Sequence, residues 1–213
     1  MKNYDCVIWD WNGTLLDDLT LALGVVNELL REYGVEELSL PRYREIFDFP
    51  VRDYYERAGL DLQKHDFHEI SEKFCSRFEE RLHLARIFPG VPSLLESIRE
   101  SGSRQFVLSG TEQNALGRMM RRYEIAELFD ATQGLEDNLA AGKVAAGREL
   151  VQRCRIEPDR TVIIGDTTHD AAVAKELGME CLLLASGHHS QERLSSLGLP
   201  VFDSLETLSV NLL

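Results

Sequence analysis

The sequence predicts an α/β fold: a doubly wound parallel sheet, Rossmann-like in type, into which an all-helical cap domain is inserted. A short apolar run near the N-terminus is followed by roughly seventy residues that show only the 3.6-residue period of helices. After Pro89-Gly90, short apolar runs alternate with helical patterns up to the C-terminus, which is the order typical of α/β folds. These runs are continuous rather than alternating, as in parallel strands covered by helices on both faces.

The first strand is expected over residues 4–9, YDCVIW, and should end at the turn-forming residues 10–14, DWNGT. Asp17 or Asp18 is then placed to cap a helix that runs to Gly34. The apolar residues of this helix follow the helical period: Leu19, Ala22, Leu23, Val26, Leu29, Leu30 and Tyr33. From there to Phe88 the pattern is helical throughout and no strand is expected.

Beyond the Pro89-Gly90 break, the sequence alternates between strand and helix patterns. The expected elements are helix 92–101, strand 104–109, helix 112–123, a short strand near 129–132, helix 143–154, strand 161–165, helix 170–177 and strand 181–185. Residues 1–15 and 89–213 are therefore expected to form the core domain. Residues 16–88 are expected to form the cap, whose own core includes Phe67, Ile70, Phe74, Phe78 and Leu82.

Composition narrows the classes of function. The 213 residues include 36 acidic and 23 basic side chains, a formal charge of −13, which argues against binding to nucleic acid or to an anionic membrane. No run resembles a secretion signal or a membrane-spanning helix, so we expect a cytoplasmic protein. The four cysteines are far apart and are expected to be buried free thiols, and the oligomeric state is not predicted.

Polar residues follow three of the expected strands at the edge where parallel strands end. Asp10 follows the first strand, Ser109-Gly110-Thr111 ends another, and Asp166 ends a third, with Asp170 four residues later. Lys143 opens the preceding helix. Carboxylates that bind metal, a cation, and hydroxyl or amide donors for an oxyanion are the groups that phosphoryl transfer requires.

The segments DWNGT at 10–14, LSGT at 108–111, Lys143 and IIGDTTHD at 163–170 resemble, in this order, the four motifs of the haloacid dehalogenase superfamily. The helical insertion resembles the cap of its phosphoglycolate phosphatase-like branch. The resemblance implies that Asp10 is the nucleophile and forms an aspartyl-phosphate. It also implies Mg²⁺ bound by Asp10, the backbone carbonyl of Asn12 and Asp166. Asp170 would either be a further metal ligand or contact the residues that bind the metal.

The resemblance implies roles for the surrounding residues as well. Ser109 would donate to a phosphoryl oxygen beside Gly13, Gly110 and Thr111, and Lys143 would neutralise the negative charges.

In the cap, Arg52 follows the turn at Phe49-Pro50 and could bind an anionic end of the substrate. Alternatively, it pairs with Asp53 or Glu56 on the cap surface. His169 is expected to be exposed, and His188 and His189 are expected to be loop residues outside the catalytic set.

One position departs from the pattern of the superfamily. Its phosphatases usually carry an acid/base aspartate two residues after the nucleophile, but this position is Asn12, whose amide cannot exchange a proton near neutral pH. A Mg²⁺-dependent phosphatase acting on a small phosphorylated metabolite is the first hypothesis. A catalytically weak phosphate-binding or regulatory protein is the second. A dehalogenase is a distant third hypothesis, because the dehalogenases of this superfamily share a tyrosine at the position of Asn12 and work without the metal.

Overall fold

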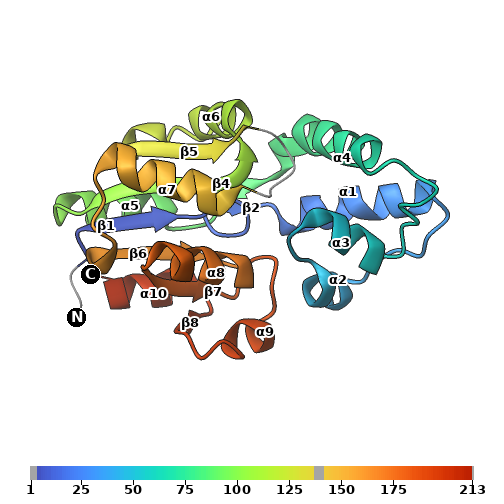
Figure 1. The fold of residues 1–213 in the computed structure, drawn as a ribbon. Coiled ribbons are helices and arrows are strands. Elements are labelled where there is room, and N and C mark those ends of the chain that lie inside the picture. Colours follow the sequence, from blue (N-terminus) through green and yellow to red (C-terminus); the bar gives the residue numbers. More distant parts are fainter. Residues whose placement is uncertain (1–3, 137–141, 213) are drawn as a thin grey trace.

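The computed structural model describes residues 4–136 and 142–212, and its centre is a six-stranded sheet (Figure 1). All neighbouring strands are parallel and lie in the order β5-β4-β1-β6-β7-β8. The strands are β1 (Cys6–Trp9), β4 (Arg104–Glu112), β5 (Ala131–Leu135), β6 (Thr161–Gly165), β7 (Glu180–Leu184) and β8 (Val201–Phe202). The predicted parallel sheet is confirmed. Its order reverses between β1 and β6, and ligands of such sheets bind at this switch point.

Helices cover both faces of the sheet and form one apolar core on each. Val7 and Trp9 of β1 pack against one layer, and Cys6 and Ile8 pack against the other, because successive side chains of a strand point to opposite faces. The first layer contains α5 (Val91–Glu100), α6 (Gln113–Arg122) and α10 (Leu205–Leu212). The second contains α7 (Lys143–Cys154), α8 (Thr168–Leu177) and α9 (Gln191–Ser195). Short 3₁₀ helices lie at Leu82–Leu84, Ala126–Leu128 and Pro158–Arg160.

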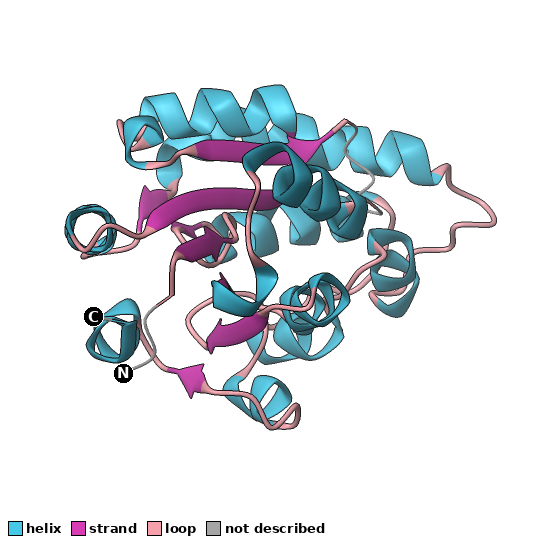
Figure 2. Ribbon diagram, turned by 60° about the vertical axis from the view of Figure 1, so that its left-hand side comes forward, coloured by secondary structure: helices cyan, strands magenta, loops and turns pink. Residues whose placement is uncertain are grey.

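Four helices lie together at the edge toward which the strands of the sheet point (Figures 1 and 2). They are α1 (Leu19–Glu32), α2 (Leu40–Ile46), α3 (Val51–Arg57) and α4 (Phe67–Arg81). Their side chains form a third apolar core, in which Leu30, Tyr43, Tyr54 and Ile70 are buried. The helical segment therefore stands over the carboxyl edge of the sheet, where the polar motifs end. We refer to residues 16–88 as the cap.

The expectation of an uninterrupted helical pattern up to Phe88 was wrong. β2 (Leu16–Asp17) and β3 (Arg86–Ile87) form a two-stranded antiparallel sheet where the chain enters and leaves the helical segment. Two-residue strands are too short to show a period, so this pairing becomes visible only when the ends of the cap meet.

Two further segments differ from expectation. β4 continues to Glu112, and its register with β5 shifts between Leu108 and Glu112. α9, β8 and α10 were not predicted. The four cysteines are free, as expected, but only Cys6 and Cys181 are buried, while Cys75 and Cys154 are half-buried.

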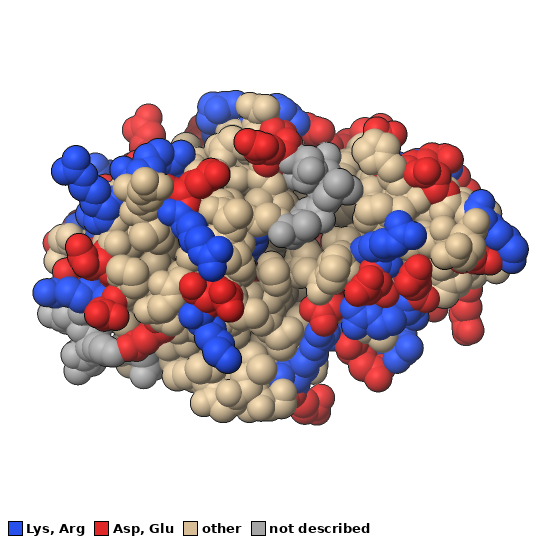
Figure 3. Space-filling model, viewed as in Figure 1, with Lys and Arg blue, Asp and Glu red and all other residues tan. Residues whose placement is uncertain are grey.

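Acidic and basic side chains are interspersed over the face of the molecule shown in Figure 3. Within residues 4–136 and 142–212, no helix combines the length and the apolar content needed to cross a membrane.

Candidate active site

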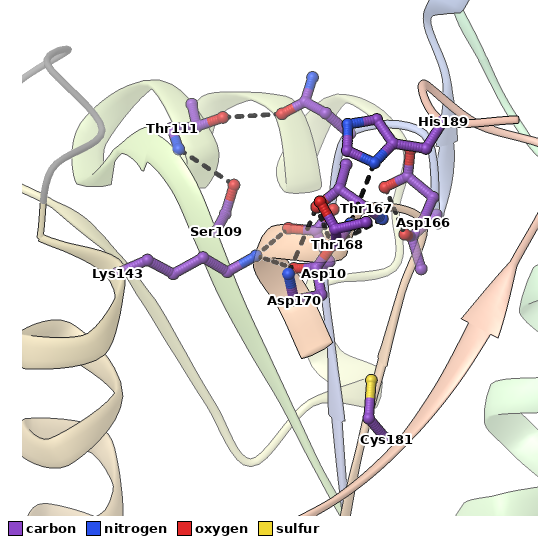
Figure 4. Close-up of polar contacts among 12 residues, drawn as sticks. Asp10, Ser109, Thr111, Lys143, Asp166, Thr167, Thr168, Asp170, Cys181 and His189 are labelled. Atoms are coloured by element: carbon purple, nitrogen blue, oxygen red, sulfur yellow. Dashed lines mark hydrogen bonds and ion pairs between the residues drawn. The ribbon is translucent and has the colours of Figure 1, made fainter. Parts of the chain in front are cut away.

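The structure brings the predicted polar residues together at the carboxyl edge of the sheet (Figure 4). Asp10 follows β1, and Lys143 is the first residue of α7. The Lys143 ammonium donates to Asp10 Oδ1 at 2.5 Å and to Asp170 Oδ1 at 2.6 Å. All three side chains are buried, so little solvent separates their charges.

The site contains more negative than positive charge. Burial raises the pKa of Asp10, and repulsion from Asp170 and Asp166 adds to this effect, while Lys143 opposes it. Burial alone would lower the pKa of Lys143, but Asp10 and Asp170 outweigh it and hold the pKa well above the usual value. Lys143 therefore stays an ammonium, and it contacts two of the three clustered carboxylates, those of Asp10 and Asp170.

Three carboxylates, those of Asp10, Asp166 and Asp170, have ligand atoms that all lie within 4.8 Å of one another. Asp166 is fully buried, and its two oxygens accept from the Thr14 hydroxyl at 3.1 Å and the His188 backbone N–H at 2.6 Å. Clustered carboxylate oxygens are the donors that hard divalent cations prefer, and such a cation would relieve the repulsion that raises the pKa of Asp10. The donor set fits a divalent metal ion.

Asp170 is the most constrained of the three carboxylates. Its Oδ1 accepts from Lys143, and its Oδ2 accepts from the backbone N–H and the hydroxyl of Thr167, at 3.0 and 2.6 Å. Thr167 caps α8 in return, so the two residues form a reciprocal capping box. These bonds outweigh burial and lower the pKa of Asp170. The geometry favours Asp170 as the residue that positions Lys143.

Ser109, Gly110 and Thr111 lie where the register of β4 shifts, a distortion common beside active sites. The Ser109 side chain is buried and lines the same cavity as Asp10. Its oxygen accepts from the Thr111 N–H at 3.1 Å, and among the described residues no acceptor faces its proton. This hydroxyl is available to donate to a bound anion.

The Asn12 amide is held between two partners. Its Nδ2 donates to Asp18 Oδ2 and its Oδ1 accepts from the Thr111 hydroxyl, both at 2.8 Å. Asp18 lies at the N-terminus of α1, as expected for a cap, but its side chain makes no capping bond there. Instead, Asp18 Oδ1 accepts from the Gly13 N–H at 2.8 Å. The Gly13 amide, expected to face the substrate, is therefore already engaged.

His188 was assigned to a loop outside the site, and the structure shows that it belongs to the site. The side chain is buried and bridges the cap and the core: Nδ1 lies 2.8 Å from the Tyr43 hydroxyl and Nε2 lies 3.3 Å from Asp18 Oδ1. Burial would lower the pKa of His188, but Asp18, Asp166 and Asp10 outweigh it and raise the pKa to about 9. His188 is thus a second cation beside the carboxylates.

His189, also assigned to a loop outside the site, is fully buried. Its Nδ1 accepts from the Thr168 N–H at 3.0 Å, which leaves Nε2 to donate to the Phe47 carbonyl at 2.9 Å. His189 therefore links the N-terminus of α8 to the cap. The signal in the sequence was the position of both histidines just after the strand expected at 181–185, on the ligand-binding edge.

His169 was expected to be exposed, but it is half-buried and its ring lies 4.8 Å from that of Phe49. Arg52 is exposed, and its guanidinium lies 5.6 Å from the centre of the Phe67 ring. It is not among the described residues that line the cavity of the site. The structure therefore does not place Arg52 on the cavity wall, and its contact with a substrate stays a prediction.

The site opens into a cavity of about 260 Å³ between the core and the cap. The core supplies charged and hydroxyl groups, among them Asp10, Ser109 and Lys143. The cap supplies mainly aromatic side chains, among them Phe47 and Phe74. A ligand here would meet polar groups at one end and an apolar wall at the other.

Fold and site together define a Rossmann-like α/β protein with a buried aspartate at the switch point of its sheet and a helical cap above it. The chain belongs to the haloacid dehalogenase-like hydrolase family, whose model matches residues 7–184. Membership of this family makes the protein a hydrolase and confirms the resemblance seen in the sequence.

Two curated relatives and one solved structure illustrate the similarity. A phosphoglycolate phosphatase of Synechococcus elongatus is 23% identical over 188 residues, which cover 88% of this chain and 87% of the relative. A 5'-nucleotidase of Pseudomonas aeruginosa is 24% identical over 198 residues, which cover 90% of this chain and 87% of the relative. A haloacid dehalogenase-like hydrolase of Streptococcus pneumoniae superimposes with a TM-score of 0.83 at 21% identity and 98% coverage of both chains, which supports the fold.

Proposed function

We propose that the protein is a Mg²⁺-dependent phosphatase that hydrolyses a small phosphorylated metabolite through an aspartyl-phosphate on Asp10. The observation that carries the proposal is the buried contact of Asp10 with Lys143, within reach of Asp166 and at the switch point of the sheet. Similarity to phosphoglycolate phosphatases across most of the chain supports the same reaction class.

The first step would transfer the phosphoryl group from the substrate oxygen to a carboxylate oxygen of Asp10, and the leaving oxygen would depart as an alkoxide or aryloxide that takes a proton from water. Lys143 would hold the carboxylate and offset the charge of the incoming phosphate. The Ser109 hydroxyl, whose proton faces no acceptor among the described residues, would donate a hydrogen bond to a phosphoryl oxygen. Attack of water on phosphorus would then release phosphate and restore Asp10.

Mg²⁺ bound by Asp10, the backbone carbonyl of Asn12 and Asp166 would stabilise the negative charge of the phosphoryl group during transfer. Asp170 would contribute indirectly, because its oxygens already hold Lys143 and Thr167. The Asn12 amide would supply no proton to the leaving alcohol, since it is an amide engaged by Asp18 and Thr111. Good leaving groups should therefore react fastest.

The test is phosphate release from a panel of phosphorylated metabolites, with and without Mg²⁺, by the wild-type protein and Asp10→Asn. We expect metal-dependent release that Asp10→Asn abolishes. Release that is unaffected by Asp10→Asn would contradict the proposal.

A second candidate, a phosphate-binding protein with little turnover, is favoured by Asn12. It predicts that a phosphorylated ligand binds in the presence of Mg²⁺ but that no member of the panel is hydrolysed.

A further inference from the structure

The cap lines the cavity with aromatic side chains and carries no lysine or arginine there among the described residues. Phe47, Phe49, Tyr55, Phe74 and Phe78 all face the cavity. The charged cap residues in its lining are Asp18, which is engaged by Asn12 and Gly13, and Glu79. A second negative charge on the substrate would therefore lose its water without gaining a cation, which is unfavourable.

The basic side chains elsewhere in the lining already have acidic partners. Lys143 contacts Asp10 and Asp170, and His188 contacts Asp18. Arg118, on α6 of the core, donates two hydrogen bonds to Glu79 Oε1 across to the cap, at 3.0 and 2.6 Å. Both Arg118 and Glu79 are about half exposed, so this pair lies at the surface end of the cavity. Arg118 is therefore not an unpaired cation facing the apolar wall.

Tyr54 on α3 and Ser71 on α4 are cap residues that line the cavity, and their buried hydroxyl oxygens have no hydrogen-bond partner among the described residues. Tyr54 is 1% exposed and Ser71 is 8% exposed, so both side chains are more than nine-tenths buried. Buried polar groups are nearly always paired in folded proteins, and an unpaired one is destabilising. Such groups in a ligand cavity are where a ligand makes its specific contacts.

Resting on the phosphatase function proposed above, we propose that Tyr54 and Ser71 form a specificity subsite. The substrate is a phosphate monoester of an uncharged, ring-sized apolar alcohol that carries one neutral hydrogen-bonding group away from the phosphate. The phosphate faces Asp10 and Lys143, the apolar body packs against the cap aromatics, and the distal polar group pairs with the two hydroxyls. A substrate with a carboxylate in that place, such as phosphoglycolate, is disfavoured.

The size of the cavity agrees with this substrate class. An apolar cavity of about 150 Å³ holds a benzene molecule. The cavity of about 260 Å³ therefore has room for a phosphoryl group together with one ring.

The test measures binding rather than turnover, because phosphonates occupy a phosphate site without being hydrolysed. Calorimetry in Mg²⁺ compares benzylphosphonate with its 4-hydroxy and 4-carboxy derivatives and with phosphonoacetate. We expect the 4-hydroxy compound to bind about 2- to 12-fold more tightly than benzylphosphonate, the range for one net hydrogen bond. The 4-carboxy compound and phosphonoacetate should bind at least about 10-fold more weakly than the 4-hydroxy compound.

The double variant Tyr54→Phe/Ser71→Ala keeps the apolar surface and removes both hydroxyls. It should abolish the preference for the 4-hydroxy compound over benzylphosphonate, while Ser97→Ala, on α5 of the core, should retain it. Persistence of the preference in the double variant, or tighter binding of either carboxylate compound, would overturn the subsite. Failure of every phosphonate to bind would overturn the phosphate site as well and would contradict the phosphatase proposal.

Discussion

Replacing Asn12 with aspartate should destabilise the protein, although it restores the residue that phosphatases of this family usually carry there. The Asn12 amide donates to Asp18 Oδ2 at 2.8 Å, so an aspartate would set two carboxylates against each other. Two like charges about 4 Å apart repel by about 4 kcal/mol at an effective dielectric constant of about 20. Allowing for relaxation, we expect Asn12→Asp to lower the free energy of unfolding by about 2–4 kcal/mol at pH 7.5.

The exchange variant Asn12→Asp/Asp18→Asn should recover most of this loss. An amide at position 18 can accept from the Gly13 N–H through its oxygen and donate to a carboxylate at position 12 through its nitrogen, which reverses the original bond. The carboxylate at position 12 would still accept from the Thr111 hydroxyl. We therefore expect a favourable coupling energy of about 2–3 kcal/mol between the two substitutions, within the range measured for contacting residues.

Urea unfolding of the wild type, both single variants and the exchange variant measures this coupling. In the exchange variant the new carboxyl group can take up a proton and donate it to the leaving oxygen, so the ratio of alkyl to aryl phosphate hydrolysis should rise by about 10²-fold. Peptide mapping must first show that position 12 is asparagine in the wild-type sample, since Asn-Gly sequences can deamidate. An Asn12→Asp protein as stable as the wild type, with no gain on adding Asp18→Asn, would show that the hydrogen bond between residues 12 and 18 does not contribute to stability.

Three further substitutions test other parts of the site. Lys143→Met leaves its two carboxylate partners buried without a cation. Thermal unfolding should therefore show that the free energy of unfolding falls by about 3–5 kcal/mol and that added Mg²⁺ restores part of it. An unchanged free energy of unfolding would contradict the role of Lys143 in offsetting the charge of the two carboxylates. In Gly13→Ala the free energy of unfolding, measured in urea, should fall by about 2 kcal/mol or more, and Mg²⁺ should bind weakly. The reason is that Gly13 has φ +73° and an added Cβ would collide with the Asp166 carboxylate. Metal affinity equal to that of the wild type would argue against this close approach. Burial lowers the pKa of His189 from 6.5 to about 4, so its neutral form contributes stability that is complete above pH 6.5 and is lost as the pH falls toward 4. Stability measured from pH 8 to pH 4 should therefore fall by about 3 kcal/mol less in His189→Gln than in the wild type, and parallel curves would contradict the assignment.

The sequence sufficed for five of the six strands of the sheet, and for the meeting of the polar residues at its edge, because both depend on simple rules. Continuous apolar runs indicated parallel strands, and the carboxyl ends of parallel strands share one edge, which brings Asp10 and Asp166 together. The pairing of β2 with β3 could not be predicted, since it requires the two ends of the cap segment to meet.

The surroundings of Asn12 were not predictable either. Asp18 has the position of a helix cap in the sequence, but its carboxylate turns to Asn12 and Gly13, where a buried amide and an N–H need an acceptor. His188 and His189 follow a strand in a loop, and no period indicates which way a loop side chain points. Their burial results from the docking of the cap, through Tyr43 and the Phe47 carbonyl, which is a long-range contact.

In the proposed reaction, Asp10 carries the phosphoryl group during turnover. The most direct measurement is acid quenching of the protein during hydrolysis of an aryl phosphate in Mg²⁺, followed by mass spectrometry of its peptides. We expect a transient phosphoryl group on the peptide that contains Asp10, formed before phosphate is released and missing in Asp10→Asn. Steady hydrolysis with no phosphorylated peptide at any time, and an equal rate in Asp10→Asn, would contradict the account.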